Sequence, residues 1–475
     1  MAILIKGGTV VLTSMIAPFD VLIDEGLIVA TGFDMDPSDH DVVYDARGLL
    51  VMPGFVDMHT HFDLPVGDFR SSDDFDNGSA AALAGGTTTF VDYISPSREQ
   101  DPLDAIQEWF EKGKTSRTDF SFHLTLTDAS ERSLLAMEKA VALGIRGFKV
   151  FQAYPDRLMM SSREIERVMA KAASLGATIF VHSEEGELIE RLRQGEHKAG
   201  NRAPIYHSLT RPSSSEGRAA REILELVHRT RCTTVIVHIS ASEVLEVLCD
   251  AARLGLPLYG ETCPQYLWLN SRFLEAPWPQ AAGYVCSPPL RTLPHLDRLW
   301  DALLSGVVQF VSTDHCPFTP AQRTAAGMDF TKIPNGLPGV EFRFPLMHTG
   351  AIEGRRFGLT RLVQLLSTNP AKICGLYPKK GTLMPGADAD LVIWDPEGVT
   401  SLNDSDQISR CGYSPYEGMM VQGSMLAVFS RGQLVFDGEN VACEPGRGEF
   451  VPRRAVSQKL LKTLRLEDYP WAFCR

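Results

Sequence analysis

The chain has 475 residues, of which 44% are hydrophobic and 22% are charged, and it carries a net charge of −13 at pH 7. The composition is that of an ordinary globular protein, and the length allows a barrel-sized core with an accessory domain. The negative charge argues against a nucleic-acid partner and against attachment to anionic lipid by charge.

The cysteines and the apolar runs indicate where the protein resides. Nine cysteines are scattered along the chain without a C-x-x-C pair, which predicts reduced thiols rather than a disulfide framework. The first apolar run is too short for a signal peptide. No run reaches the roughly 18 residues of a membrane span, so no membrane partner is expected. The sequence therefore predicts a cytoplasmic protein.

The two ends of the chain both read as short strands joined by turns. Near the start these strands lie within residues 2–50, and near the end within 389–397 and 425–438, where Arg431-Gly432 is a turn signal. We expect residues 1–50 and 386–445 to form one discontinuous β-sandwich domain. Residues 446–475 are arginine-rich and irregular, and we expect a C-terminal arm suited to contact with a neighbouring subunit.

The insert, residues 51–385, alternates β-like apolar runs with amphipathic helical segments such as 162–176 and 216–230. This alternation predicts a parallel (β/α)8 barrel of the TIM type. A doubly wound sheet would also show alternating strands and helices, but the count of eight apolar runs favours a closed barrel. The runs are 51–59, 87–94, 120–126, 145–151, 178–184, 233–240, 257–263 and 307–313.

Polar side chains occur where several of these runs end. His59 and His61 are spaced i, i+2, so in a strand they project from the same face and could bind one divalent ion. As an isolated pair they could equally be ordinary polar residues at a strand end. In a (β/α)8 enzyme the chemistry lies at the carboxyl ends of the strands, so the combination predicts a metal site. The set is His59, His61, Lys149, His182, His238 and Asp314.

Lys149 and Asp314 are the unusual members of this set. A lysine inside GFKVF is either buried, with a lowered pKa, or it points out of the barrel and reaches solvent. A buried amine that has reacted with carbon dioxide becomes a carbamate, whose two oxygens could bridge two metals. Asp314 could bind one metal and take a proton from metal-bound water, although an isolated Asp there could simply cap a helix. Glu184 and Glu185 are more typical of a solvated charge pair than of support for a ligand.

Several longer motifs resemble the cyclic amidohydrolases, in particular the D-hydantoinase, phenylhydantoinase and dihydropyrimidinase family. They include PGFVDMHTHFDLP (53–65), GFKVFQAY (147–154), VHSEEGELI (181–189), CSPPLR (286–291), STDHCPF (312–318) and NGLPGVE (335–341). The resemblance implies two divalent metal ions per subunit, usually zinc. His59, His61 and Asp314 would hold one ion, His182 and His238 the other, and carboxylated Lys149 would bridge them.

The resemblance also implies how the substrate is bound and attacked. A hydroxide bridging the metals would attack the ring carbonyl, and Asp314 would pass its proton to the leaving nitrogen. Tyr154 would hydrogen-bond the developing oxyanion, while Ser287 and Asn335 would fix the cyclic amide. Members of the family are usually homo-oligomers, either tetramers or dimers.

We therefore predict metal-dependent hydrolysis of a small cyclic amide, a 5-substituted hydantoin or a dihydropyrimidine, to an N-carbamoyl amino acid. Alternatives are an allantoinase-like enzyme, a mononuclear deaminase, which would not need Lys149, and a non-catalytic dihydropyrimidinase-related scaffold. The scaffold proteins resemble family members that have lost metal ligands, whereas here every ligand position is occupied. Dihydroorotase-like enzymes carry an arginine where this chain has Asp63, which would repel a substrate carboxylate.

Overall fold

The computed structural model describes residues 2–37, 42–155, 157–325, 327–352, 354 and 356–465. Its centre is an eight-stranded parallel sheet with the order β17-β16-β15-β14-β13-β12-β11-β8. A parallel bridge from Thr60 to His315 joins the two ends of this order, so the sheet is the predicted (β/α)8 barrel. Its strands are β8 (Phe55–Thr60), β11 (Thr87–Ile94), β12 (Asp119–Thr125), β13 (Gly147–Phe151), β14 (Thr178–His182), β15 (Thr234–Ile236), β16 (Leu258–Thr262) and β17 (Phe310–Val311).

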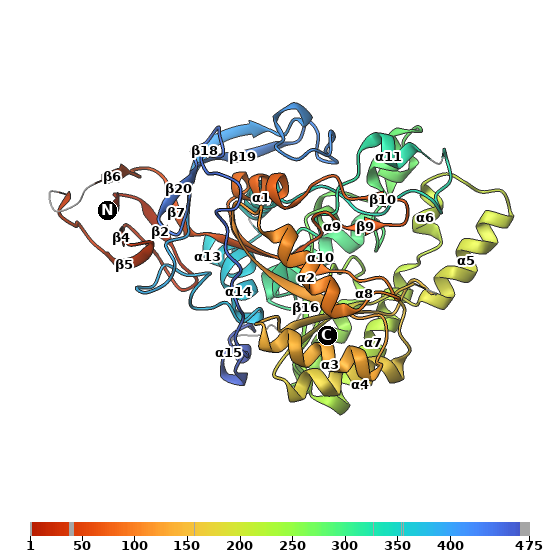
Figure 1. Cartoon of the computed structure of the whole chain (residues 1–475). Helices are drawn as coiled ribbons and strands as arrows, with labels where there is room; N and C mark the ends of the chain where they lie inside the picture. Colours follow the sequence, from red (N-terminus) through yellow and green to blue (C-terminus); the bar gives the residue numbers. More distant parts are fainter. Residues whose placement is uncertain are drawn as a thin grey trace.

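Helices cover the outside of the barrel (Figure 1). In α4 a capping box between Ser161 and Glu164 starts the helix, and buried apolar residues recur at helical spacing from Ile165 to Ala172. The longer helices are α1 (Phe75–Ala84), α2 (Pro102–Gly113), α3 (Glu131–Ala142), α4 (Ser162–Ser174), α5 (Gly186–Lys198), α7 (Ser213–Thr230), α8 (Glu243–Arg253), α10 (Leu293–Ser305) and α12 (Arg343–Ile352). Shorter elements are α6 (Ile205–Leu209), α9 (Gln265–Trp268), η2 (Ser271–Glu275), η3 (Gln280–Tyr284), α11 (Pro320–Thr324), α13 (Leu359–Val363), η4 (Gln364–Thr368), α14 (Asn369–Ile373), η5 (Asp404–Asp406) and α15 (Gln458–Lys462).

Two smaller sheets lie beside the barrel and are built from both ends of the chain (Figure 1). The four-stranded sheet has the order β5-β4-β1-β6 and the six-stranded sheet β20-β19-β18-β7-β2-β3. They share one apolar core, in which Ile5 and Val21 lie with Ile393 and Phe429, so the predicted β-sandwich is confirmed. The strands are β1 (Ile3–Lys6), β2 (Thr9–Val11), β3 (Ile16–Ala17), β4 (Asp20–Asp24), β5 (Leu27–Gly32), β6 (Val42–Asp45), β7 (Leu50–Pro53), β18 (Leu391–Ser401), β19 (Met420–Ser430) and β20 (Gln433–Phe436).

The apolar run 51–59 is two strands rather than one. β7 ends at Pro53 and pairs with β18 of the sandwich, whereas β8 begins at Phe55 and pairs with β11 of the barrel. Gly54 separates them, and a Cβ atom at this position would lie 2.2 Å from Thr88 Oγ1. The chain therefore passes from one domain into the other within a single apolar run, where only glycine fits.

The described part of the C-terminal arm packs on its own chain. Val451 N donates to Phe120 O at 2.7 Å, and Arg453 N donates to Gly144 O at 2.9 Å. The rest of the expected arm, 466–475, and with it Cys474, lies outside the described residues. Seven buried cysteines are free thiols, but the expectation of reduced thiols is wrong for Cys249, which is in a disulfide. Among the described residues no helix combines the length and apolarity that a membrane crossing needs.

Candidate metal centre

One cavity of about 550 Å³ opens at the carboxyl ends of the barrel strands. The ends of β8, β14 and β15 and the loop after β17 supply polar side chains to it, as the barrel topology predicts. The structure thus brings together every predicted site residue. They are His59, His61, Lys149, Tyr154, His182, His238, Ser287, Asp314 and Asn335.

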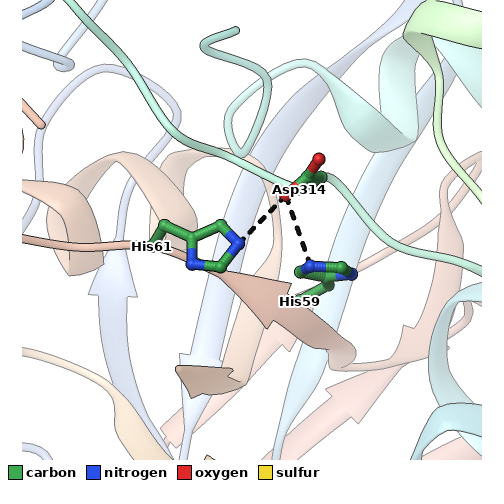
Figure 2. A group of neighbouring side chains, drawn as sticks. All are labelled: His59, His61 and Asp314. Atoms are coloured by element: carbon green, nitrogen blue, oxygen red, sulfur yellow. Dashed lines mark ion pairs between the residues drawn. The ribbon is translucent and has the colours of Figure 1, made fainter. Parts of the chain in front are cut away.

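His59, His61 and Asp314 form the first half of the site (Figure 2). The Nε2 atoms of His59 and His61 lie 3.3 Å and 3.1 Å from Asp314 Oδ1, and one ligand atom from each of the three side chains lies within 4.8 Å of the others. His59 Nε2 is buried and has no hydrogen-bond partner among the described residues. Two imidazoles and a carboxylate that converge in this way fit one divalent ion.

Lys149, His182 and His238 form the second half. His182 Nδ1 lies 3.0 Å from His238 Nε2, and the ring centroids of His59 and His238 are 5.4 Å apart, so the two halves adjoin. The Lys149 side chain points into the barrel, with Nζ 4.9 Å from the centroid of the Tyr93 ring. Among the described residues no carboxylate lies within ion-pair distance of Lys149 Nζ. An amine here is available for chemistry rather than held by an acid.

Burial sets the protonation of these groups. It is the largest cause of the lowered pKa values of His59, His182 and His238, and the charge of Lys149 lowers them further. Burial also lowers the pKa of Lys149 to about 8. Burial alone would raise the pKa of Asp314, but His59, His61 and Lys149 outweigh it and lower the value. His59, His182 and His238 are thus neutral imidazoles and Asp314 is an ionised carboxylate, the forms that bind metals.

Two supporting carboxylates, Glu184 and Glu261, are part of this site and were not predicted from the sequence. Glu184 is buried, and its Oε2 accepts hydrogen bonds from His182 Nε2 at 2.7 Å and Arg211 Nη1 at 2.8 Å. Its interpretation as half of a solvated pair is therefore wrong, although Glu185 does pair with exposed Arg218. Glu261, on β16, accepts from His59 Nδ1 at 2.9 Å. The sequence does carry a signal for each supporting role: Glu184 follows His182 by two residues, and Glu261 lies within an apolar strand.

Tyr154, Ser287 and Asn335 also line the cavity. The Tyr154 ring centroid is 5.3 Å from that of His182, and burial raises the pKa of its phenol, which therefore remains a donor. Ser287 Oγ lies 3.2 Å from His207 Nε2. Tyr154, His238 and Asp314 all have positive φ angles, of 65°, 42° and 51°. Such strained backbone is concentrated at functional sites, where surrounding contacts hold it in place.

The position of Asp63 differs from the expectation that its carboxylate faces the substrate. The Asp63 carboxylate lies 2.7 Å from Arg70 Nη1 and 3.2 Å from Lys112 Nζ, and it does not line the cavity. Its predicted repulsion of a substrate carboxylate is therefore not supported. The residues that do line the cavity include Arg98 and Arg157, together with the apolar segment Leu64 to Val66.

A parallel barrel whose strand ends carry two histidine pairs, an aspartate and a buried lysine defines the class of metal-dependent barrel hydrolases. Residues 50–435 match the amidohydrolase family, and the chain belongs to that family.

The relatives cover nearly the whole chain. It is 38% identical to a D-hydantoinase of Geobacillus stearothermophilus over 95% of this chain and 96% of the relative. It is 33% identical to a dihydropyrimidinase of Rattus norvegicus, over 98% and 91% of the two chains. The crystal structure of a dihydropyrimidinase from Brevibacillus agri superposes with a TM-score of 0.94 at 38% identity, covering 96% of this chain and all of that one.

Proposed function

We propose that the chain hydrolyses a cyclic amide, opening a 5-substituted hydantoin or a dihydropyrimidine to the N-carbamoyl amino acid. The observation that carries this proposal is the single cavity in which neutral imidazoles, the Asp314 carboxylate and an unpaired, buried Lys149 meet. The relatives that match over nearly the full length bear the names D-hydantoinase and dihydropyrimidinase, which supports this substrate class.

Two divalent ions fit the two halves of the site. His59, His61 and Asp314 would hold one, and His182 and His238 the other. Zinc suits this set of imidazole nitrogens and carboxylate oxygens. Lys149 Nζ would add to the carbon of carbon dioxide and lose a proton, and the resulting carbamate would be a ligand shared by the two ions. Bound ions of this kind polarise a carbonyl and lower the pKa of water to about 7.

The residues of the chain then position the substrate and move the proton. The Asp314 carboxylate takes a proton from the attacking water and delivers it to the ring nitrogen as the carbon–nitrogen bond breaks. Tyr154 donates its Oη–H to the oxygen of the attacked carbonyl, where negative charge develops. Ser287 and Asn335, which also line the cavity, orient the ring amide.

We further propose a homo-oligomer, a dimer or a tetramer, built from subunits with a sandwich domain (1–53 and 386–445), a barrel (55–385) and a C-terminal arm. Phe33, 68% exposed, and Val43, 45% exposed, are apolar side chains on the outside of the sandwich, as expected of a surface that a second subunit covers. Light scattering on the purified protein measures the molecular mass of the oligomer and so tests this proposal.

A turnover panel with parallel metal analysis tests the function. It contains dihydrouracil, hydantoin, D- and L-phenylhydantoin, allantoin and dihydroorotate, assayed before and after metal removal and zinc restoration. We expect two ions per chain and turnover of hydantoins or dihydrouracil that disappears and returns with the metal. Preferred turnover of allantoin would support the allantoinase alternative, and a metal-loaded protein inactive on the whole panel would contradict the proposal.

A further inference from the structure

Glu261 lies between the two halves of the site. It is completely buried on β16, a strand that supplies no predicted metal ligand. One of its oxygens, Oε2, accepts a hydrogen bond from His59 Nδ1 at 2.9 Å and another from the backbone N of His238 at 3.2 Å. His59 belongs to the first half of the site and His238 to the second.

The contact with His59 selects the nitrogen that can bind a metal. With Glu261 ionised, Oε2 can only accept, so Nδ1 carries the proton and the lone pair is left on Nε2. Nε2 is the nitrogen that faces Asp314 Oδ1 at 3.3 Å. Glu261 thereby fixes both the tautomer and the ring orientation of His59.

The contact with His238 acts on the backbone. His238 has φ 42°, a left-handed conformation that a residue with a side chain adopts only where its surroundings hold it. The hydrogen bond from His238 N to Glu261 is one of these restraints. The turn it supports carries the His238 imidazole to within 3.0 Å of His182 Nδ1.

We propose that Glu261 is a positioning residue shared by the two metal positions, so that one carboxylate supports both. This inference rests on the proposed function, because it requires two ions at the site. Loss of the Glu261 carboxylate then weakens both positions at once, although the residue touches neither ion.

Glu184 provides a matched control from the same chain. It is also completely buried and also accepts a hydrogen bond from a predicted ligand, His182 Nε2. Its other hydrogen-bond partner among the described residues is Arg211, so it contacts only the second half of the site. Loss of its charge should therefore weaken one position and not both.

The test is zinc uptake by the metal-free full-length protein, measured by elemental analysis, with cobalt absorption spectra as a second readout. Wild type should bind two ions per chain. In Glu261→Gln we expect the affinity of both positions to fall about 10- to 100-fold, with both ions lost over the same range of chelator concentration. Glu184→Gln should pass through a state with one ion per chain.

Glu261→Asp keeps the charge, but its side chain is one methylene too short to reach both partners. It should therefore behave like Glu261→Gln, and it replaces that variant in the test if Glu261→Gln does not fold. Wild-type affinity in these variants, or loss of one ion while the other is held normally, would overturn this shared role. Failure of the wild type to bind two ions would instead overturn the proposed function.

Discussion

Two buried lysines in this molecule have opposite environments. Lys149, 2% exposed, has no carboxylate within ion-pair distance among the described residues, and burial lowers its pKa to about 8. Lys380, 1% exposed, has Nζ 2.6 Å from Asp119 and 2.8 Å from both Asp388 and Asp390. Burial alone would lower the pKa of Lys380, but these three carboxylates raise it above the usual value.

The difference shows that partners, not burial, decide what a buried lysine does. Asp119 begins β12 at the amino end of the barrel, and Asp388 and Asp390 precede β18, so Lys380 joins the barrel to the sandwich. A cation matched by carboxylates serves the structure. Lys149, on β13 at the candidate metal centre, has no matching carboxylate among the described residues, and its amine is available to react.

Replacing Lys149 should have the largest effect on turnover. In Lys149→Met we expect kcat/KM to fall at least about 1,000-fold, because catalytic groups that act together lose most of their effect when one is removed. We also expect the metal content to fall below two ions per chain. The metal-free variant should be at least as stable as wild type, since an unpaired buried amine is replaced by an apolar side chain of similar length. Kinetics, elemental analysis and urea unfolding measure these effects. Full turnover in the variant would remove Lys149 from the mechanism.

Replacing Lys380 should affect stability instead. Lys380→Met removes the buried cation that all three carboxylates share and leaves only Lys379 beside Asp388 and Arg431 beside Asp119. Breaking a buried pair from one side costs about 3–5 kcal/mol. We expect the urea midpoint to fall accordingly, while kcat/KM per folded molecule stays within about twofold of wild type. A variant with unchanged stability and lost activity would reverse the roles assigned to the two lysines.

The sequence predicted the barrel and the ligand types because local periodicity and strand-end position are properties of single segments. It did not separate β7 from β8, because that boundary depends on the space beside Gly54. It also missed the contact of Glu261 with His59, residues 202 positions apart, and the role of Lys380, whose partner Asp119 is 261 positions away. Such pairings depend on how distant strands come together. The orientation of Asp63 likewise follows from its partners Arg70 and Lys112 rather than from its own segment.

The two lysines should also differ in pH dependence. The pKa of Lys149, about 8 against a model-peptide value of 10.5, lies below its unfolded value, so the cost of burying its charge is present below pH 8 and disappears as pH rises. Only the neutral amine adds to carbon dioxide. At constant dissolved carbon dioxide, reactivation of metal-free enzyme by zinc should therefore accelerate about tenfold per pH unit below 8 and level off above it.

The pKa of Lys380 is raised, so its stabilisation is fully present below the unfolded value and is lost only as pH rises through a still higher folded value. Comparing wild type with Lys380→Met from pH 6 to 9 should therefore give a constant stability difference. A reactivation rate independent of pH, with carbon dioxide held constant, would contradict the role of the Lys149 amine.

Lys379 provides the smallest and most discriminating test, because it contacts the same cluster from the surface. Its side chain is 56% exposed, and Nζ lies 2.7 Å from Asp388 Oδ1. Water and salt screen this pair, and Asp388 keeps Lys380 as its partner when Lys379 is removed. Lys379→Met should therefore cost less than about 1 kcal/mol in urea unfolding, and less still at high salt. A cost equal to that of Lys380→Met would mean that the number of cations near the carboxylates matters and the burial of Lys380 does not.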